Sequence, residues 1–278
     1  MRKMPTPQCE PRVHRTRVSD RSELAPGVIL LGFHAPELVR ATRAGQYVMA
    51  IPPTGEASAT ALGIYEADGE RASLLFFLTG KRTRELAELR PGDTLDVSGP
   101  LGNGFDLTGN PRHVAIVAGG VGIASVLLAA QQLVAAGTRV ELFYGARSAE
   151  LLVDARRFAD TGCELVLATD DGSHGFRGFI TALLEQRDAM PDLILACGPS
   201  PMLRAVGRIA AQRGVRTQLS LEETFACGVG GCWGCVVPLA RTSAQAPSFP
   251  PASAGGSDVV YARICKEGPV FFNDELRW

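Results

Sequence analysis

The sequence predicts a multi-domain protein that combines β and α/β architecture: an N-terminal antiparallel β-barrel, a central doubly wound parallel sheet, and a small C-terminal domain. Three observations support this expectation. Residues 10–108 hold short apolar runs separated by Gly, Pro and Asp, residues 111–221 alternate apolar runs with helical patterns, and residues 223–278 hold a cluster of cysteines. The length of 278 residues is sufficient for two domains and a small third one.

The first region contains four apolar runs of strand length, and turn residues between them are typical of an antiparallel barrel or sandwich. The runs are VILLGFHAP, GQYVMAIP, ALGIYEAD and ASLLFFLTG. A helical stretch, TRELAELR, is followed by Pro91 and Gly92, which commonly stop a helix. Residues 10–108 are therefore expected to fold as a β-barrel.

The second region alternates strands and helices, which predicts a parallel sheet covered by helices on both faces. The expected strands are HVAIVAGG, RVELFYGAR, CELVLATDD, DLILACGP and RTQLSLEE. The expected helices between them are GIASVLLAAQQLVAAG, AELLVDARRFADTG, GFITALLEQ and SPMLRAVGRIAAQRG.

Composition excludes several classes of partner. The formal net charge is −1, so nothing indicates binding to nucleic acid or to an anionic membrane surface. No apolar run reaches the roughly 18 residues that a membrane-spanning helix needs. The N-terminal stretch MRKMPTPQCE lacks the apolar core of a secretory signal, so we expect a cytoplasmic protein whose cysteines are reduced, metal-bound or catalytic.

The third region carries the most specific pattern. Cys227, Cys232 and Cys235 have the spacing C-x4-C-x2-C, and Cys265 follows further along the chain. This spacing is that of a plant-type [2Fe–2S] cluster. Close wrapping of backbone around a cluster requires conformations that glycine adopts readily, and the interleaved glycines are Gly228, Gly230, Gly231 and Gly234. Residues 223–278 are therefore expected to form a small iron–sulfur domain, with Trp233 shielding one side.

Two other interpretations of the cysteines stay open. Zinc is one, although zinc sites usually combine paired C-x2-C knuckles. Buried structural cysteines are the other, although so many glycines would pack a core badly. Cys9 and Cys163 lie away from the cluster and are expected to be incidental. The segment ARTSAQAPSFPPASAGGSD, before Cys265, is almost uncharged and is expected to be a flexible surface excursion.

Two further motifs fall where parallel strands end. The stretch AGGVGIAS, residues 118–125, follows an apolar strand and opens a helix, an arrangement that brings backbone N–H groups close to a phosphate. The stretch LACGPSPMLRAV, residues 195–206, places Cys197 at the end of another strand, at the edge of the sheet where ligands bind. Each motif alone is weak evidence, because many α/β domains need a tight turn there.

Together these motifs resemble the electron-transfer subunit of class B dihydroorotate dehydrogenase, within the wider ferredoxin–NADP reductase-like group. The matching stretches are GQYVM at 45–49 (as aligned from Gly45), SGPLGNGFDL at 98–107, AGGVGIAS at 118–125, ATDDGSHGFRG at 168–178, ACGPSPML at 196–203, SLEETFACGVGGCWGCVV at 220–237 and ARICKEGPVF at 262–271. The resemblance implies an FAD-binding barrel over 10–108, an NAD-binding α/β domain over 111–221 and a [2Fe–2S] domain over 223–278.

The resemblance also implies roles for single residues. The four cysteines Cys227, Cys232, Cys235 and Cys265 would ligate the cluster. The nucleotide would lie near Gly119, Gly120 and Gly122, and the nicotinamide near Cys197, Gly198 and Pro199. The implied partner is a catalytic dihydroorotate dehydrogenase subunit of pyrimidine biosynthesis, in a heterotetramer. Because the chain would only hold redox groups in sequence, no side chain is expected to act as a catalytic acid or base.

The flavin strand departs from the family pattern. The family reads Arg-Pro-[Ile/Leu]-Ser where this chain has Thr60, Ala61, Leu62 and Gly63, and the family's Gly-x-Gly-Thr reads Gly80-Lys81-Arg82-Thr83. We expect FAD to bind nevertheless; the expected contacts are Leu62, Gly63, Phe76, Arg82 and Thr83. Arg82 would replace the lost arginine near the flavin pyrophosphate. Two alternatives remain at this point: a reductase module for a different redox enzyme, or a non-catalytic iron–sulfur protein without flavin.

Overall fold

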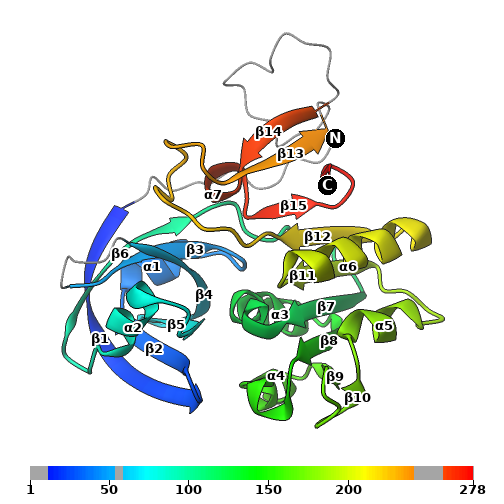
Figure 1. Ribbon diagram of the computed structural model, residues 1–278, viewed down its shortest axis with the longest axis horizontal. Coiled ribbons are helices and arrows are strands. Elements are labelled where there is room, and N and C mark those ends of the chain that lie inside the picture. The colour runs from blue at the N-terminus through cyan, green and yellow to red at the C-terminus, as the bar shows by residue number, and fades with distance from the viewer. Residues whose placement is uncertain (1–11, 54–58, 241–258, 278) are drawn as a thin grey trace.

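The computed structural model of the protein describes residues 12–53, 59–240 and 259–277 (Figure 1). Within them, the first region forms a closed antiparallel barrel in the order β1-β2-β5-β4-β3-β6. Its strands are β1 (Arg12–Ala25), β2 (Val28–His34), β3 (Tyr47–Ile51), β4 (Thr60–Asp68), β5 (Arg71–Phe77) and β6 (Thr94–Leu101). Two short helices, α1 (Pro36–Ala41) and α2 (Lys81–Ala87), accompany the barrel. The β-barrel expected from the sequence is confirmed.

Two barrel strands, β1 and β6, were missing from the sequence-based expectation because neither carries an apolar run. Strand β1 reads RVHRTRVSDRSELA, and most of its side chains are exposed. It nevertheless closes the barrel by pairing with both β2 and β6. Backbone hydrogen bonding, rather than side-chain burial, places this polar strand.

The second region forms a seven-stranded sheet in the order β10-β9-β8-β7-β11-β12-β15. Its strands are β7 (His113–Gly119), β8 (Arg139–Ala146), β9 (Glu164–Thr169), β10 (Phe176–Arg177), β11 (Leu193–Cys197), β12 (Arg216–Ser220) and β15 (Val270–Phe272). The helices are α3 (Leu127–Ala135), α4 (Ala155–Asp160), α5 (Ile180–Glu185) and α6 (Ser200–Arg213), with short 3-10 helices at Gly120–Ser125 and Ala149–Leu151. All pairs are parallel except β12–β15.

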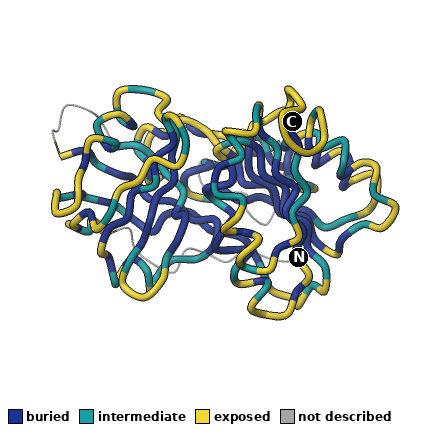
Figure 2. The backbone as a smooth tube through the Cα atoms, turned by 90° about the horizontal axis from the view of Figure 1, so that it is seen from below, coloured by how far each residue is buried: buried dark blue, intermediate teal, exposed yellow. Residues whose placement is uncertain are grey.

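Alternation along β7 divides the sheet into two faces. Val114 and Ile116 belong to a core shared with the barrel interior and with helices α3 and α4, whereas Ala115 and Val117 belong to a core shared with α5 and α6. Helices therefore cover both faces, as a doubly wound sheet requires. Figure 2 shows the buried strands of the sheet side by side.

The predicted helix after β7 begins differently from the expectation. Residues 120–125 form a 3-10 helix, and the α-helix α3 starts only at Leu127. A β-carbon on Gly122 would lie 2.2 Å from the carbonyl oxygen of Cys197. The turn is therefore pressed against the end of β11, and this tight packing accounts for the short, tightly wound start.

The C-terminal region is joined to both other parts. Strands β13 (Val236–Ala240) and β14 (Val259–Arg263) form a two-stranded antiparallel sheet, and α7 (Ile264–Glu267) follows directly. Strand β15 then pairs with β12 and extends the central sheet. Asn103, just after the barrel, donates from its side chain to the carbonyls of Glu267 and Val270. Most of the predicted flexible excursion, residues 241–258, and Cys9 lie outside the described residues.

No helix in the described part of the chain combines the length and apolar character needed to cross a membrane.

Candidate functional site

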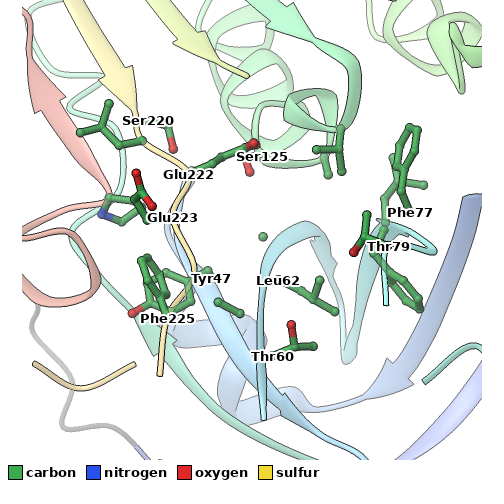
Figure 3. Close-up of a pocket in the computed structure, with 18 of the residues that line it drawn as sticks. Tyr47, Thr60, Leu62, Phe77, Thr79, Ser125, Ser220, Glu222, Glu223 and Phe225 are labelled. Carbon is green, nitrogen blue, oxygen red and sulfur yellow. The ribbon is translucent and has the colours of Figure 1, made fainter. Parts of the chain in front are cut away.

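A cavity of about 260 Å³ lies where the barrel meets the carboxyl edge of the central sheet. Strands β3, β4 and β5 form one wall, and the 3-10 helix Gly120–Ser125 and residues 220–225 form the other (Figure 3). The carboxyl edge of a parallel sheet is where α/β proteins bind ligands. The cavity is therefore the first candidate for a cofactor site.

Four of the five residues expected to contact flavin line this cavity, namely Leu62, Gly63, Phe76 and Thr83. Arg82 does not line it. Its guanidinium donates a 3.2 Å hydrogen bond to the carbonyl of Ala59, next to Thr60 at the start of β4. Arg82 thus reaches the strand position at which the family carries its arginine.

Thr83 has a structural task at the start of α2. Its hydroxyl accepts hydrogen bonds from the backbone N–H groups of Thr79 and Gly80 and donates to the carbonyl of Gly80. A hydroxyl offers one donor and two acceptor positions, so all three are occupied. Thr83 shapes the turn, and it could bind a ligand through its hydroxyl only by giving up one of these bonds.

The two nucleotide motifs lie together. Ala118 and Cys197 are direct neighbours on the paired strands β7 and β11. A β-carbon on Gly119 would lie 2.6 Å from the sulfur of Met202, so Gly119, like Gly122, is needed for packing within the protein. Gly120 differs, because its φ is +51° and no atom would meet a β-carbon within 4 Å. Among the three glycines, Gly120 is the one whose open side leaves room for a ligand.

Gly198 and Pro199 follow Cys197 and form the turn into α6. Gly198 has a φ of +152°, and its nearest contact for an added β-carbon is Met202 at 2.8 Å. Pro199 precedes the first residue of α6, Ser200. The predicted nicotinamide segment is therefore a fixed turn that lies against Gly119.

A buried thiol and a carboxyl meet beside the cavity. The Cys197 thiol donates a 3.4 Å hydrogen bond to Glu222. Burial raises the pKa of Cys197 well above its ordinary value, and the charge of Glu222 raises it further. Glu222 is an exposed residue that lines the cavity, and desolvation by the surrounding protein raises the pKa of its carboxyl. Both groups therefore favour their protonated forms.

The cysteine loop, defined as residues 226–235, lies against the barrel next to this cavity. Cys235 and Cys265 are buried, Cys227 is half-buried and Cys232 is exposed. Backbone N–H groups donate to three of the sulfurs: Gly231 to Cys227 at 3.3 Å, Gly234 to Cys232 at 3.4 Å, and Cys265 to Cys235 at 3.4 Å. Such donors stabilise thiolates.

The four thiols lie in two pairs. Cys232 is the thiol with the largest effect on the pKa of Cys227, and Cys235 is the one with the largest effect on that of Cys265. Burial works against ionisation of Cys227, but hydrogen bonds from the backbone of Cys232 and Val229 outweigh it and lower its pKa to about 6. Among the described residues, no three His, Cys, Asp or Glu side chains yet converge closely enough to hold a metal ion.

Glycine conformation and one arginine shape the loop. Gly228 and Gly230 have φ values of +69° and +82°, whereas Gly231 and Gly234 do not adopt the left-handed region, so the expected need for glycine holds at two of the four positions. Arg263 donates to the carbonyl of Gly230 at 2.8 Å and stacks over the Trp233 ring at 4.5 Å. Arg263, whose role the sequence did not reveal, holds both ends of the loop's tip.

Tyr47 connects the cavity to the cysteine loop. It lines the cavity, and its hydroxyl lies 2.7 Å from the carbonyl oxygen of Cys265 and 2.9 Å from that of Gly228. Its ring packs against Phe225 at 5.1 Å between centroids, and Phe225 also lines the cavity. Sequence reasoning missed Tyr47, Phe225, Glu222 and Ser125, although all four lie within the stretches that carried the resemblance.

No family model matches the chain. The electron transfer subunit of dihydroorotate dehydrogenase B (NAD(+)) from Geobacillus sp. (strain WCH70) is 37% identical over 213 residues, which covers 76% of each chain. The subunit of the same name from Listeria monocytogenes serovar 1/2a is 33% identical over 269 residues, covering 94% of this chain and 97% of the relative.

Solved structures agree with these relatives. The structure described as "Insights into flavin-based electron bifurcation via the NADH-dependent reduced ferredoxin-NADP oxidoreductase structure" matches with a TM-score of 0.80 and 27% identity, covering 95% of this chain and 90% of that one. A ferredoxin reductase of carbazole 1,9a-dioxygenase, at 20% identity and a TM-score of 0.66 over 75% and 68% of the chains, shares the fold. The chain therefore belongs to the family of oxidoreductase electron transfer subunits of NAD-linked dihydroorotate dehydrogenase B.

Proposed function

We propose that this chain passes electrons between NAD(H), FAD in the interdomain cavity and a [2Fe–2S] cluster on Cys227, Cys232, Cys235 and Cys265. A catalytic dihydroorotate dehydrogenase subunit, bound in a heterotetramer, would be the electron donor or acceptor at the far end. The relatives carry this activity and the NAD dependence in their names.

The observation that carries the proposal is the position of Tyr47 and Phe225. Both side chains line the cavity, and the Tyr47 hydroxyl reaches the backbone of the cysteine loop at Gly228 and the backbone of a fourth cysteine at Cys265. A cofactor in the cavity and a cluster on the loop would therefore be separated by little more than one aromatic side chain. Separate pockets in different parts of the molecule would offer no such connection.

The cysteines suit a [2Fe–2S] cluster better than zinc. Two irons with four thiolates take two thiolates each, and the thiols already lie in two pairs. Backbone donors point at three of the sulfurs, as thiolates and sulfides require. Binding would draw the two pairs together, and thiolate ligands fit the reducing cytoplasm that we propose as the compartment.

The cavity suits a flavin between the cluster and the nicotinamide. Flavins accept a hydride and release its electrons singly, which a cluster requires. Leu62 and Phe76 offer apolar walls, and the Cys197–Pro199 turn lies on the opposite side, where a nicotinamide would stand. Arg82, beside Ala59, would supply the positive charge for the flavin pyrophosphate.

Analysis of the purified chain tests these assignments. We expect one FAD, two irons and two acid-labile sulfides per chain, reduction of artificial acceptors by NADH, and no oxidation of dihydroorotate by the chain alone. Zinc in place of iron would disprove the cluster, and absence of flavin would favour the non-catalytic interpretation. Dihydroorotate oxidation without a partner would contradict the subunit role.

Identification of the partner tests the pathway. We expect the tagged chain to retain a catalytic dihydroorotate dehydrogenase from its own host, and the pair to couple dihydroorotate oxidation to NAD reduction. Retention of a different redox enzyme, with no coupling to dihydroorotate, would favour the alternative of a reductase module for another system.

A further inference from the structure

Gly63 lines the cavity at a position where a side chain would have little room. It pairs with Tyr47 in the antiparallel ladder of β3 and β4, and its φ lies outside the left-handed region. The backbone there would accept any residue. A β-carbon on Gly63 would, however, lie 2.6 Å from the hydroxyl oxygen of Ser125. Ser125 therefore occupies the space in which a side chain of residue 63 would begin.

Ser125 comes from the opposite side of the cavity. It is the last residue of the 3-10 helix Gly120–Ser125, is half-buried and lines the cavity. Its hydroxyl is near enough to the Cys197 thiol to lower the pKa of that thiol, which itself donates a hydrogen bond to Glu222. Figure 3 shows Ser125 and Glu222 together on the wall facing Leu62. A hydroxyl has one donor and two acceptor positions, so capacity for a ligand remains after the contact with Cys197.

The Ser125 hydroxyl is a polar group next to apolar side chains of the cavity wall. Leu62, Phe76 and Ala124, which line the same cavity, are apolar. Ligand sites combine such apolar walls with a few placed polar groups that fix orientation. In the proposed arrangement the flavin ring lies at this end of the cavity, next to the predicted nicotinamide turn that starts at Cys197. Its edge carries nitrogen and oxygen atoms that need hydrogen-bond partners.

We infer that the Ser125 hydroxyl binds the polar edge of the flavin ring, and that Gly63 is glycine because the strand leaves this position to Ser125. The inference rests on the proposed function and deepens it, by assigning to the nucleotide-binding domain a flavin contact that a barrel strand would otherwise provide. The hydroxyl would come from Ser125 on the 3-10 helix and not from residue 63 on β4.

Four variants of the full-length chain separate the hydroxyl from the space it fills. Ser125→Ala removes the hydroxyl, and Gly63→Ala crowds it. Gly63→Ser/Ser125→Ala moves the hydroxyl to the strand, and Gly63→Ala/Ser125→Ala fills the strand position without one. The two double variants differ by a single oxygen atom, and a β-carbon at residue 63 meets the Cα and Cβ of residue 125 at an ordinary 3.6 Å.

Binding is measured on the flavin-depleted chain by fluorescence titration with FAD and with riboflavin, which has the ring but no phosphate. Ser125→Ala should weaken binding of both ligands by the same factor, about three- to tenfold, as expected for one hydrogen bond. Gly63→Ser/Ser125→Ala should return within about twofold of wild type, and Gly63→Ala/Ser125→Ala should stay weak. Arg82→Ala serves as a comparison, because it should weaken binding of FAD but not of riboflavin.

Thermal melts establish that each variant is folded. Equal affinities of Ser125→Ala and wild type, or of the two double variants, would overturn the inference while leaving flavin binding intact. Failure of wild type to take up either ligand would overturn the proposed function and this inference together. Weakening of FAD binding alone by Ser125→Ala would also overturn it, because the contact would then be to the phosphates.

Discussion

The cavity wall and the cysteine loop lie side by side, but they are held in place differently. The barrel wall consists of strands β3, β4 and β5, in which β4 pairs with β3 over residues 60–63 and with β5 over residues 64–68. Residues 221–235 contain no helix or strand. That loop is held by left-handed glycines, by Arg263 and by the hydroxyl of Tyr47.

The difference separates a site that exists before its ligand from one that its ligand completes. The cavity already has volume, walls and polar groups in the chain alone. The thiols lie in two pairs, and a cluster would supply the remaining bonds. Changes in the wall should therefore act locally on affinity, whereas changes in the loop should act on both cluster and stability.

The largest effect is expected from the ligands. Serine at any of Cys227, Cys232, Cys235 or Cys265 should lose most of the iron and sulfide, because a neutral hydroxyl is a poor substitute for a thiolate. Iron and sulfide analysis with visible absorption measures the loss. Cys163→Ser, away from the loop, should retain a full cluster. Full iron content in two or more of the four ligand variants would sink the assignment.

Next comes the backbone of the loop. Gly228→Ala places a β-carbon at a φ of +69° and 2.6 Å from Cγ of Met49. Strain and crowding together should destabilise the chain by about 1–3 kcal/mol, measured by urea unfolding. Gly231→Ala is the matched control, because its β-carbon would meet nothing within 4 Å. Equal stability of the two variants would show that the loop does not depend on this conformation.

A smaller effect is expected from the Tyr47 hydroxyl. Tyr47→Phe keeps the ring against Phe225 but removes the donor that the carbonyls of Gly228 and Cys265 share. The free energy of unfolding should fall by about 1 kcal/mol. Tyr261→Phe, whose residue is 57% exposed, should leave it unchanged. A similar loss in both variants would contradict a specific link between barrel and loop.

The sequence predicted the apolar strands of the barrel and the central sheet. It did not reveal the polar strand β1 or the contacts between distant residues, for physical reasons. Apolar runs revealed the strands whose side chains fill a core, such as β7 and β11, but not β1, whose position depends on backbone pairing with β2 and β6. Cysteine spacing is the basis of the proposed ligand set, because ligand geometry restricts local spacing. The sequence predicted Gly63 as a flavin contact but could not reveal Ser125, because only the fold brings Ser125 beside it.

Long-range contacts explain the other omissions. Tyr47 and Gly228 are distant in sequence, and no local pattern links a tyrosine on β3 to a loop that follows β12. Arg82 was expected to meet a phosphate, and its bond to Ala59 is compatible with that proposal without testing it. The periodicity of apolar residues indicates which side chains are buried, whereas these contacts depend on how the barrel, the central sheet and the C-terminal region pack together.

The smallest effect concerns Glu222 and depends on pH. Enclosure raises the pKa of this carboxyl above the ordinary value of 4.5, so the folded chain holds the proton more tightly than the unfolded chain. Stability from this group is thus fully present below the unfolded pKa and is lost as pH rises through the higher folded value.

Glu222→Gln imitates the protonated form and keeps an acceptor for the Cys197 thiol. Its melting temperature should equal that of wild type near pH 4 and exceed it once the pH has risen above the folded pKa of Glu222. Glu223→Gln, which changes the same charge on the cavity wall without the thiol contact, provides the comparison. If the melting temperatures of wild type and Glu222→Gln changed with pH in parallel, the protein would not desolvate this carboxyl. The cavity wall would then be less preformed than the structure indicates, and in this respect closer to the cysteine loop.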